Sequence, residues 1–302
     1  MSLTTRDLML RAWRAKTIIP AFNIPYLPMM EPIVCALRDT GNIGLIQVAR
    51  LEWLKFQAQS LQAVRDEYER HGDPNFTRLH LDHVPVVDED GQRVDFLPVL
   101  REAIQLGYES VMIDGSRLPL SENIAETRKA VELGHQAGVA VEAELGAVLG
   151  HETGPLPPYE ELFQSGKGFT DPAEAGKFLS ETGADWLSVA IGNIHGAISA
   201  AGKSQKKVAA RLNIDQLDRI QRQAPAPMVL HGGSGIQSVC IRDSIRHGIA
   251  KINICTTIRQ PYEKLAGQSG VQAREAVYQA ARQTMLDELG IRGTAALLAG
   301  ET

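Results

Sequence analysis

The sequence predicts an α/β protein in which eight parallel β-strands alternate with helices and close into a barrel. Three observations support this fold class. Short apolar runs rich in β-branched residues recur along the chain, segments of helical length separate them, and glycines follow several of those segments. Alternating strands and helices are typical of a parallel sheet covered by helices. A chain of 302 residues is long enough for one such barrel.

Eight apolar runs are the predicted strands. They lie at residues 18–23, 43–49, 78–83, 110–116, 139–146, 186–192, 227–233 and 250–256. The competing fold is a doubly wound open sheet, which usually has fewer strands, and its GxGxxG fingerprint after the first strand is absent from this sequence. The sequence therefore favours a (β/α)₈ barrel, the TIM barrel.

Five segments between the strands each fit one α-helix. They lie at residues 95–106, 121–137, 172–182, 213–223 and 237–247. Ser121, Asp171 and Asn213 stand at or near three of the starts and are residue types that cap helices. Four of the helices are followed by a glycine, where a left-handed residue is often needed. These glycines are Gly107, Gly138, Gly183 and Gly248.

The C-terminal part of the chain adds a further helical segment at residues 257–289, with a break expected near 267–270. We therefore expect one TIM-barrel domain over residues 1–302 with a C-terminal helical extension at about 257–302. Residues 147–169 and 196–212 are predicted to be long loops. Such loops are often lids or binding loops, and a plain surface insertion is the open alternative.

The composition excludes several function classes. The net charge of −5 argues against nucleic acid and anionic membranes as partners. No apolar run reaches the ~18 residues of a membrane span, and the first residues lack the apolar core of a signal peptide. Cys35, Cys240 and Cys255 are too few and too far apart for a disulfide framework. We expect a cytoplasmic protein.

Polar residues collect at the ends of the predicted strands, where barrels of this type place their catalytic groups. They are Asn23, Asp82, His83, Asp114, Glu144, His195, His231, Asn253 and Thr256. Three histidines with one open position are typical of a catalytic zinc site, which can polarise a carbonyl oxygen. We therefore interpret His83, His195 and His231 as zinc ligands and the Asp82 carboxylate as a proton carrier. For each histidine alone, a hydrogen bond to a loop is the alternative.

An anion site is predicted beside these residues. Residues 231–235 form a glycine-rich segment whose backbone N–H groups could cradle a phosphate. Thr256 and Arg259 lie at the start of the last long helix, where the helix dipole also favours an anion. Arg259 could grip a phosphate through two hydrogen bonds, or it could form a surface salt bridge.

With these residues in view, the chain resembles the class II, zinc-dependent ketose-bisphosphate aldolases, which act on fructose- and tagatose-bisphosphate. The matching segments follow the family's order at residues 21–23, 79–83, 110–116, 141–146, 189–196, 230–235 and 251–254. The resemblance implies a lyase that reversibly cleaves a phosphorylated ketose to dihydroxyacetone phosphate and an aldehyde. It also implies a homo-oligomer, dimer or tetramer, and a monovalent cation near the phosphate.

The resemblance assigns roles to individual residues. His83, His195 and His231 match the zinc ligands, and Asp114 and Glu144 match positions that touch a second metal site in some members. The residues that match catalytic groups are Asp82, the acid/base at the carbon-4 hydroxyl, Glu152, the loop glutamate that moves the carbon-3 proton, and Asn253, which steadies the ene-diolate. The expected substrate and phosphate binders are Asn23, Gly196, Gly232, Gly233, Ser234, Thr256 and Arg259.

Several loops depart from the family pattern. They follow Asn23, Ala49 and His83, where Pro25-Tyr26, an unusual 49–55 segment and an acidic 87–91 insertion stand. These loops lie where the sugar binds, so an aldolase for another ketose remains open: a monophosphate, an acidic or a deoxy sugar. A non-catalytic sugar-phosphate or metal binder is a further alternative. A Schiff-base mechanism would need a lysine at a strand end, and Lys251 stands near the start of its strand.

Overall fold

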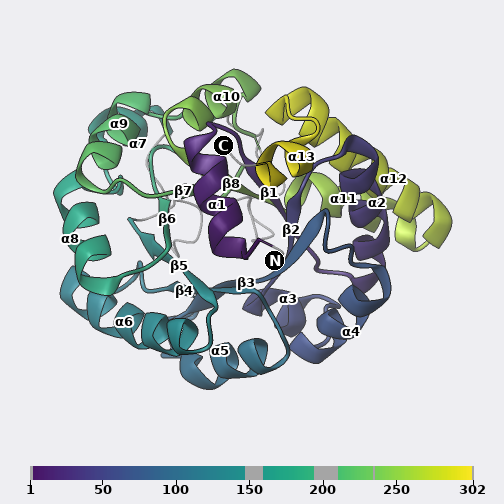
Figure 1. Ribbon diagram of the computed structural model, residues 1–302, viewed down its shortest axis with the longest axis horizontal. Helices are drawn as coiled ribbons and strands as arrows, with labels where there is room; N and C mark the ends of the chain where they lie inside the picture. The colour runs from purple at the N-terminus through teal and green to yellow at the C-terminus, as the bar shows by residue number, and fades with distance from the viewer. Residues whose placement is uncertain (1–2, 147–158, 194–209, 234, 301–302) are drawn as a thin grey trace.

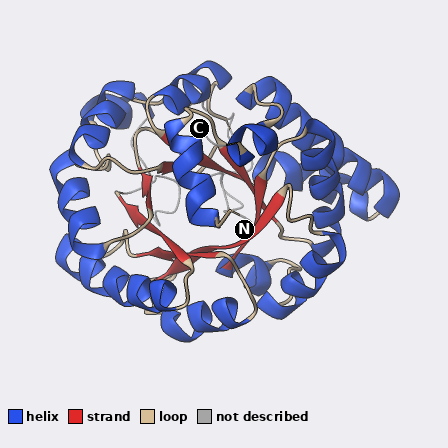
Figure 2. Cartoon of the chain, in the orientation of Figure 1, coloured by secondary structure: helices blue, strands red, loops and turns tan. Residues whose placement is uncertain are grey.

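The computed structural model describes residues 3–146, 159–193, 210–233 and 235–300. It shows a closed barrel of eight parallel strands inside a ring of helices (Figure 1, Figure 2). The strands are β1 (Ile19–Asn23), β2 (Gly44–Ala49), β3 (Thr77–Pro85), β4 (Ser110–Asp114), β5 (Ala140–Leu145), β6 (Trp186–Val189), β7 (Met228–Leu230) and β8 (Ile249–Ile254). Each strand pairs with its sequence neighbours, and β8 closes the barrel on β1. The predicted TIM barrel is confirmed.

The helices of the ring follow the strands in order. They are α2 (Met30–Thr40), α3 (Arg50–Lys55), α4 (Leu61–His71), α5 (Phe96–Gln105), α6 (Leu120–Gln136), α7 (Tyr159–Ser165), α8 (Pro172–Thr182), α9 (Ile214–Gln223) and α10 (Ser238–Arg246), with a short 3₁₀ turn η1 (Leu27–Met29) before α2. The C-terminal part forms α11 (Thr256–Ala266), α12 (Gly270–Gln283), the π-helix η3 (Thr284–Leu289) and α13 (Thr294–Ala299). None of the described helices is long and apolar enough to cross a membrane.

One helix lies across the N-terminal mouth of the barrel. In Figure 1, α1 (Thr5–Arg14) is drawn over the opening enclosed by the strands. Its buried residues Leu8, Met9 and Ala12 pack against Trp186 and Val229 from the strands. This apolar plug closes the N-terminal end of the barrel. An open site can therefore form only at the C-terminal ends of the strands.

Most predicted boundaries agree with the structure to within one or two residues. Asp171 and Asn213 cap their helices by accepting from Glu174 N–H and Gln216 N–H. The expected cap at Ser121 is wrong, because α6 begins one residue earlier and follows Pro119. The segments 50–55 and 159–165, predicted as loops, contain the short helices α3 and α7. The break in the C-terminal segment falls between α11 and α12.

Candidate active site

The central pair of the site lies at an irregularity in β3. The prediction that the strand ends at His83 is wrong, because β3 continues to Pro85. Its register with β4 shifts between Leu81 and Val84, and His83 has a φ of +37°. Neighbouring residues of a regular strand point to opposite faces. The shift breaks this alternation, so that Asp82 and His83 both reach the same end of the barrel.

His83 and His231 face each other across that end. His83 Nε2 lies 2.7 Å from His231 Nδ1. Two predicted second-site carboxylates flank this pair: Glu144 Oε2 lies 3.1 Å from His231 Nδ1, and Asp114 Oδ2 lies 3.5 Å from His83 Nδ1. Ligand atoms of Asp82, His83 and His231 lie within 4.8 Å of one another, as do those of His83, Asp114 and Glu144. Imidazole nitrogens and carboxylate oxygens fit zinc, so the donor set suits the expected metal.

Asp82 is buried and held at both carboxylate oxygens. Asn23 Nδ2 donates to Oδ2 at 3.0 Å, and Asn253 Nδ2 donates to Oδ1 at 2.9 Å. Gln47 Nε2 in turn donates to Asn23 Oδ1 at 2.8 Å, which orients the Asn23 amide. Asn23, a predicted substrate binder, and Asn253, a predicted catalytic residue, therefore both support the predicted acid/base. Each carboxylate oxygen keeps a further lone pair for a substrate hydroxyl.

The electrostatics of the site favour positive charge between its carboxylates. Burial alone would lower the pKa of His83, but Asp82, Asp114 and Glu144 raise it to about 10. Burial alone would raise the pKa of Asp82, but His83, Lys251 and His231 hold it below its ordinary value. The carboxylate of Asp82 is therefore ionised, and the field around His83 suits a bound cation.

A second polar layer lies beneath the first and was missed from the sequence. It contains His80, Glu142 and Lys251, all fully buried. Burial would raise the pKa of Glu142, but Lys251 and His231 hold it well below its usual range. Burial and Lys251 together lower the pKa of His80 to about 3, so this ring is neutral.

A signal for this layer was present in the sequence. Three strands carry polar residues two positions apart, and residues i and i+2 of a strand share a face. The pairs are His80 with Asp82, Glu142 with Glu144, and Lys251 with Asn253. The second residue of each pair reaches the open end of the barrel. The first residue lies one layer deeper in the barrel interior.

Glu52 is a buried carboxyl that sequence reasoning also missed, in the unusual segment after β2. Its Oε2 accepts from Ala49 N–H at 2.8 Å and from Asn23 Nδ2 at 3.3 Å, and Cys255 Sγ lies 3.7 Å from Oε1. Burial, with the Asp82 charge adding to it, raises the pKa of Glu52 to about 8. Glu52 therefore helps to hold Asn23 against Asp82, and no spacing pattern marked it.

The glycine-rich segment after β7 passes close to β8. A side chain at Gly233 would meet Ile252 at 2.8 Å and the Asn253 carbonyl at 3.1 Å, so the close approach requires glycine. Gly232 has a φ of +69°, which also favours glycine. Thr256 begins α11 beside this segment. Four predicted site residues lie outside the described residues: Glu152, His195, Gly196 and Ser234.

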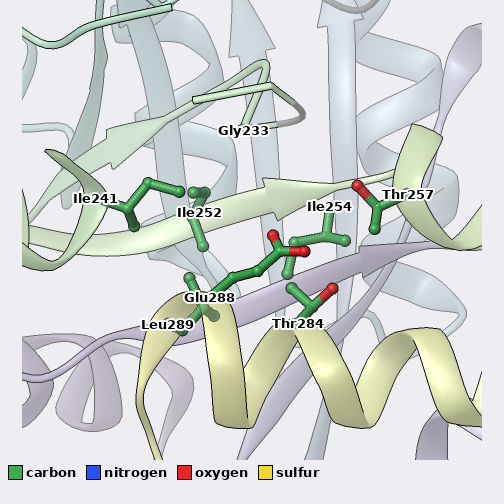
Figure 3. A pocket seen from close by; sticks show the side chains of 8 residues that line it. All are labelled: Gly233, Ile241, Ile252, Ile254, Thr257, Thr284, Glu288 and Leu289. Carbon is green, nitrogen blue, oxygen red and sulfur yellow. The ribbon is translucent and has the colours of Figure 1, made fainter. Parts of the chain in front are cut away.

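A small cavity lies behind Gly233, between β8 and the C-terminal helices. Figure 3 shows the Glu288 carboxylate and the hydroxyls of Thr257 and Thr284 in its otherwise apolar lining. Its volume of about 10 Å³ leaves room for at most one water molecule. The cavity is therefore not the substrate site.

Arg259 is engaged with its own helix instead of facing an open anion site. Its Nη1 lies 2.6 Å from Glu263 Oε1, and its guanidinium lies over the Phe56 ring, 5.2 Å from the centroid. The Tyr26 hydroxyl donates to the same Glu263 oxygen at 2.8 Å. At the rim beside β1 and β8, the ion pair of Arg259 and Glu263 therefore lies among aromatic rings.

The fold recurs in solved structures of aldolases. The YdjI aldolase of Escherichia coli K12 superimposes with a TM-score of 0.75 at 26% identity, covering 98% of this chain and 100% of that one. A putative fructose-1,6-biphosphate aldolase of Coccidioides immitis gives a TM-score of 0.75 at 23% identity, over 97% and 98% of the two chains. The second likeness, at this identity, concerns the fold alone.

Sequence comparison points the same way. Fructose-bisphosphate aldolases of Streptococcus pyogenes serotypes M3 and M1 are 37% identical to this chain over 203 residues. The alignment covers 66% of this chain, and the chain spans only 60% of the length of these relatives. The profile of the family described as fructose-bisphosphate aldolase class-II matches residues 3–292. Because this match covers nearly the whole barrel, the chain belongs to the class-II fructose-bisphosphate aldolase family.

Proposed function

We propose that this protein is a zinc-dependent aldolase that reversibly cleaves a phosphorylated ketose, similar to fructose- or tagatose-1,6-bisphosphate, into dihydroxyacetone phosphate and an aldehyde. The observation that carries the proposal is the Asp82 carboxylate, fixed by two amides directly beside the His83–His231 pair. Membership of the family supports the same reaction. An ionised carboxylate next to a cation site is what a reversible proton transfer at a hydroxyl requires.

In this proposal His83 Nε2 and His231 Nδ1 would hold the zinc ion, with His195 as the third ligand. Bound zinc would act as a Lewis acid that polarises the ketone carbonyl of the substrate. Asp114 and Glu144 flank the histidines and compensate the positive charge. The donor set supports zinc, which takes nitrogen and oxygen ligands together.

Asp82 is the proposed acid/base at the carbon-4 hydroxyl. During cleavage its carboxylate accepts the hydroxyl proton, and during condensation it returns that proton. Asn23 and Asn253 orient the carboxylate and lower the cost of keeping its charge in a buried position. Glu152 is the proposed carrier of the carbon-3 proton.

The phosphate of the dihydroxyacetone end is proposed to bind at the glycine-rich segment and the start of α11, through backbone N–H groups and the helix dipole. The proposed binders are Gly196, Gly232, Gly233, Ser234 and Thr256, with a monovalent cation nearby. We further propose one domain, a homo-oligomer and a cytoplasmic setting, the last supported by three free cysteines.

A second candidate is an aldolase for a ketose without a far phosphate, such as a monophosphate, an acidic or a deoxy sugar. The ion pair of Arg259 with Glu263 favours it. A guanidinium engaged in this way has fewer free donors for a phosphate, and Glu263 places a negative charge at the same rim.

Removal of metal tests the reaction class. We expect a chelated sample to lose cleavage of ketose bisphosphates and to regain it when zinc is added, measured as release of dihydroxyacetone phosphate. Equal cleavage before and after chelation would contradict the zinc mechanism. If the zinc-loaded protein neither cleaves nor exchanges the carbon-3 proton of dihydroxyacetone phosphate by NMR, the non-catalytic alternative gains support.

Asp82→Ala tests the acid/base. We expect kcat to fall by roughly 10²–10⁴ because proton transfer at the carbon-4 hydroxyl is lost. Zinc content should match that of the unaltered protein, since His83 and His231 are retained. A variant with full zinc content and unchanged kcat would remove Asp82 from the mechanism.

Glu52→Gln tests the buried carboxyl through pH. The pKa of Glu52 is near its ordinary value of 4.5 in the unfolded chain and about 8 in the folded protein. Its stabilising contribution is therefore complete below about pH 4.5 and is lost as the pH rises through 8. Glutamine stays neutral. The free energy of unfolding of the variant should therefore rise relative to that of the unaltered protein, by at most about 1.4 kcal/mol per pH unit between pH 5 and 8.

The measurement is the free energy of unfolding in urea at each pH. Glu132→Gln, at an exposed position of α6, controls for loss of one surface charge. A constant difference between Glu52→Gln and the unaltered protein across this range would show that Glu52 is already charged in the folded state.

Arg259→Met distinguishes the two substrate classes. Because Arg259 is paired with Glu263, we expect kcat/KM to change by the same factor for a ketose 1,6-bisphosphate and its 1-phosphate analogue. Lys264→Met, an exposed position on α11, is the control for lost charge. A loss of about 10-fold or more confined to the bisphosphate would instead place Arg259 at the far phosphate.

A further inference from the structure

A buried ion pair lies directly beneath the proposed metal site and takes no part in the steps above. Lys251 Nζ lies 2.8 Å from Glu142 Oε2, and both side chains are fully buried. Replacing such a pair by apolar residues is often neutral or even stabilising, so stability alone is a weak reason for it. The contact of Glu142 with His231, which lies above the pair, indicates another role.

The two oxygens of Glu142 are divided between different partners. Oε1 lies 2.8 Å from His231 Nε2. Oε2 accepts from Trp186 Nε1 at 2.6 Å and carries the Lys251 ion pair. The side chains of Trp186 and Lys251 thus anchor one oxygen, and the other is left for His231.

This division favours one ring nitrogen of His231 as the metal ligand. Carboxylates flank both ring nitrogens, Glu142 at Nε2 and Glu144 at Nδ1. Because Glu142 is held by Trp186 and Lys251 and only accepts hydrogen bonds, the ring that binds a metal keeps its proton on Nε2. The lone pair is then on Nδ1, the atom that lies 2.7 Å from His83 Nε2 and 3.1 Å from Glu144 Oε2. Histidine ligands are commonly fixed in this way by a carboxylate behind them.

We propose that Lys251 and Trp186 are positioning residues that act through Glu142 to hold His231 with its Nδ1 toward the metal. The inference rests on the proposed function only in taking the His83–His231 pair as the metal site. Lys251 lies two residues before Asn253 on β8 and pairs with Glu142 beneath His231. It therefore acts on the ligand from behind and does not face the substrate.

Lys251 holds Glu142 through an ion pair and Trp186 holds it through one N–H donor, so the two contributions can be tested by separate variants. Lys251→Met removes the lysine that pairs with Glu142 and leaves a side chain of similar volume. Trp186→Phe removes one N–H donor and keeps the ion pair. Ser188→Ala is the matched control, because Ser188 is fully buried two residues further along β6 and its hydroxyl has no hydrogen-bond partner in the described part of the chain.

The first readout is zinc affinity, measured by competition with a chromophoric chelator and independent of substrate. We expect Lys251→Met to weaken zinc binding by 10–100-fold, the usual effect of losing a partner behind a ligand. Trp186→Phe should weaken it less, and Ser188→Ala should leave it unchanged. Folded Lys251→Met and Trp186→Phe proteins that both bind zinc as tightly as the unaltered chain would overturn the proposal.

The second readout needs no variant, so it stands even if Lys251→Met does not fold. In the zinc-loaded, ¹⁵N-histidine-labelled chain, we expect His231 to bind through Nδ1 and to keep a slowly exchanging proton on Nε2. Zinc bound through Nε2 would overturn the proposal. Both readouts are separate from turnover: a chain that binds zinc as described but cleaves no ketose phosphate would contradict the proposed function and leave this inference standing.

Discussion

The candidate site depends on a local break in one strand. A regular β-strand directs neighbouring side chains to opposite faces, yet Asp82 and His83 are needed on the same side. The register shift in β3 and the positive φ of His83 provide this. Backbone conformations of this kind are uncommon outside glycine and tend to occur at functional sites. Asn23, Asn253 and His231 then converge on the two side chains from β1, β8 and the end of β7.

The barrel interior pairs its charges in two layers. The upper layer holds the carboxylates and histidines suited to a cation and a proton. The lower layer holds His80, Glu142 and Lys251, with Trp186 donating to Glu142. Isolated buried charges are costly, so each needs a partner or a hydrogen bond. The pairing also restricts geometry: His231 has a carboxylate on both ring nitrogens, and Asp82 has an amide on both oxygens.

Apolar runs and the polar residues that follow them are local signals. They were sufficient to predict the barrel and to predict that His83, His231, Asp82 and Asn253 lie together at one end of it. The bulge at His83 was not predictable, since it depends on the register between β3 and β4. Glu52 was missed because its partners, Asn23 on β1 and Cys255 just after β8, come from distant parts of the chain. Glu142 and Lys251 could have been found from their i, i+2 spacing with Glu144 and Asn253. The ion pair of Arg259 with Glu263 has the i, i+4 spacing of a helix and was open from the sequence, but Phe56 and Tyr26 are brought to it by the fold.

The proposed chemistry rests on a metal centre formed by His83 and His231. X-ray absorption spectroscopy of the zinc-loaded protein tests this most directly. We expect a zinc shell dominated by imidazole nitrogens at about 2.0–2.1 Å, with three histidines contributing, and a lower histidine count in His231→Ala. Zinc coordinated by cysteine sulfur at about 2.3 Å, or an unchanged histidine count in His231→Ala, would contradict it.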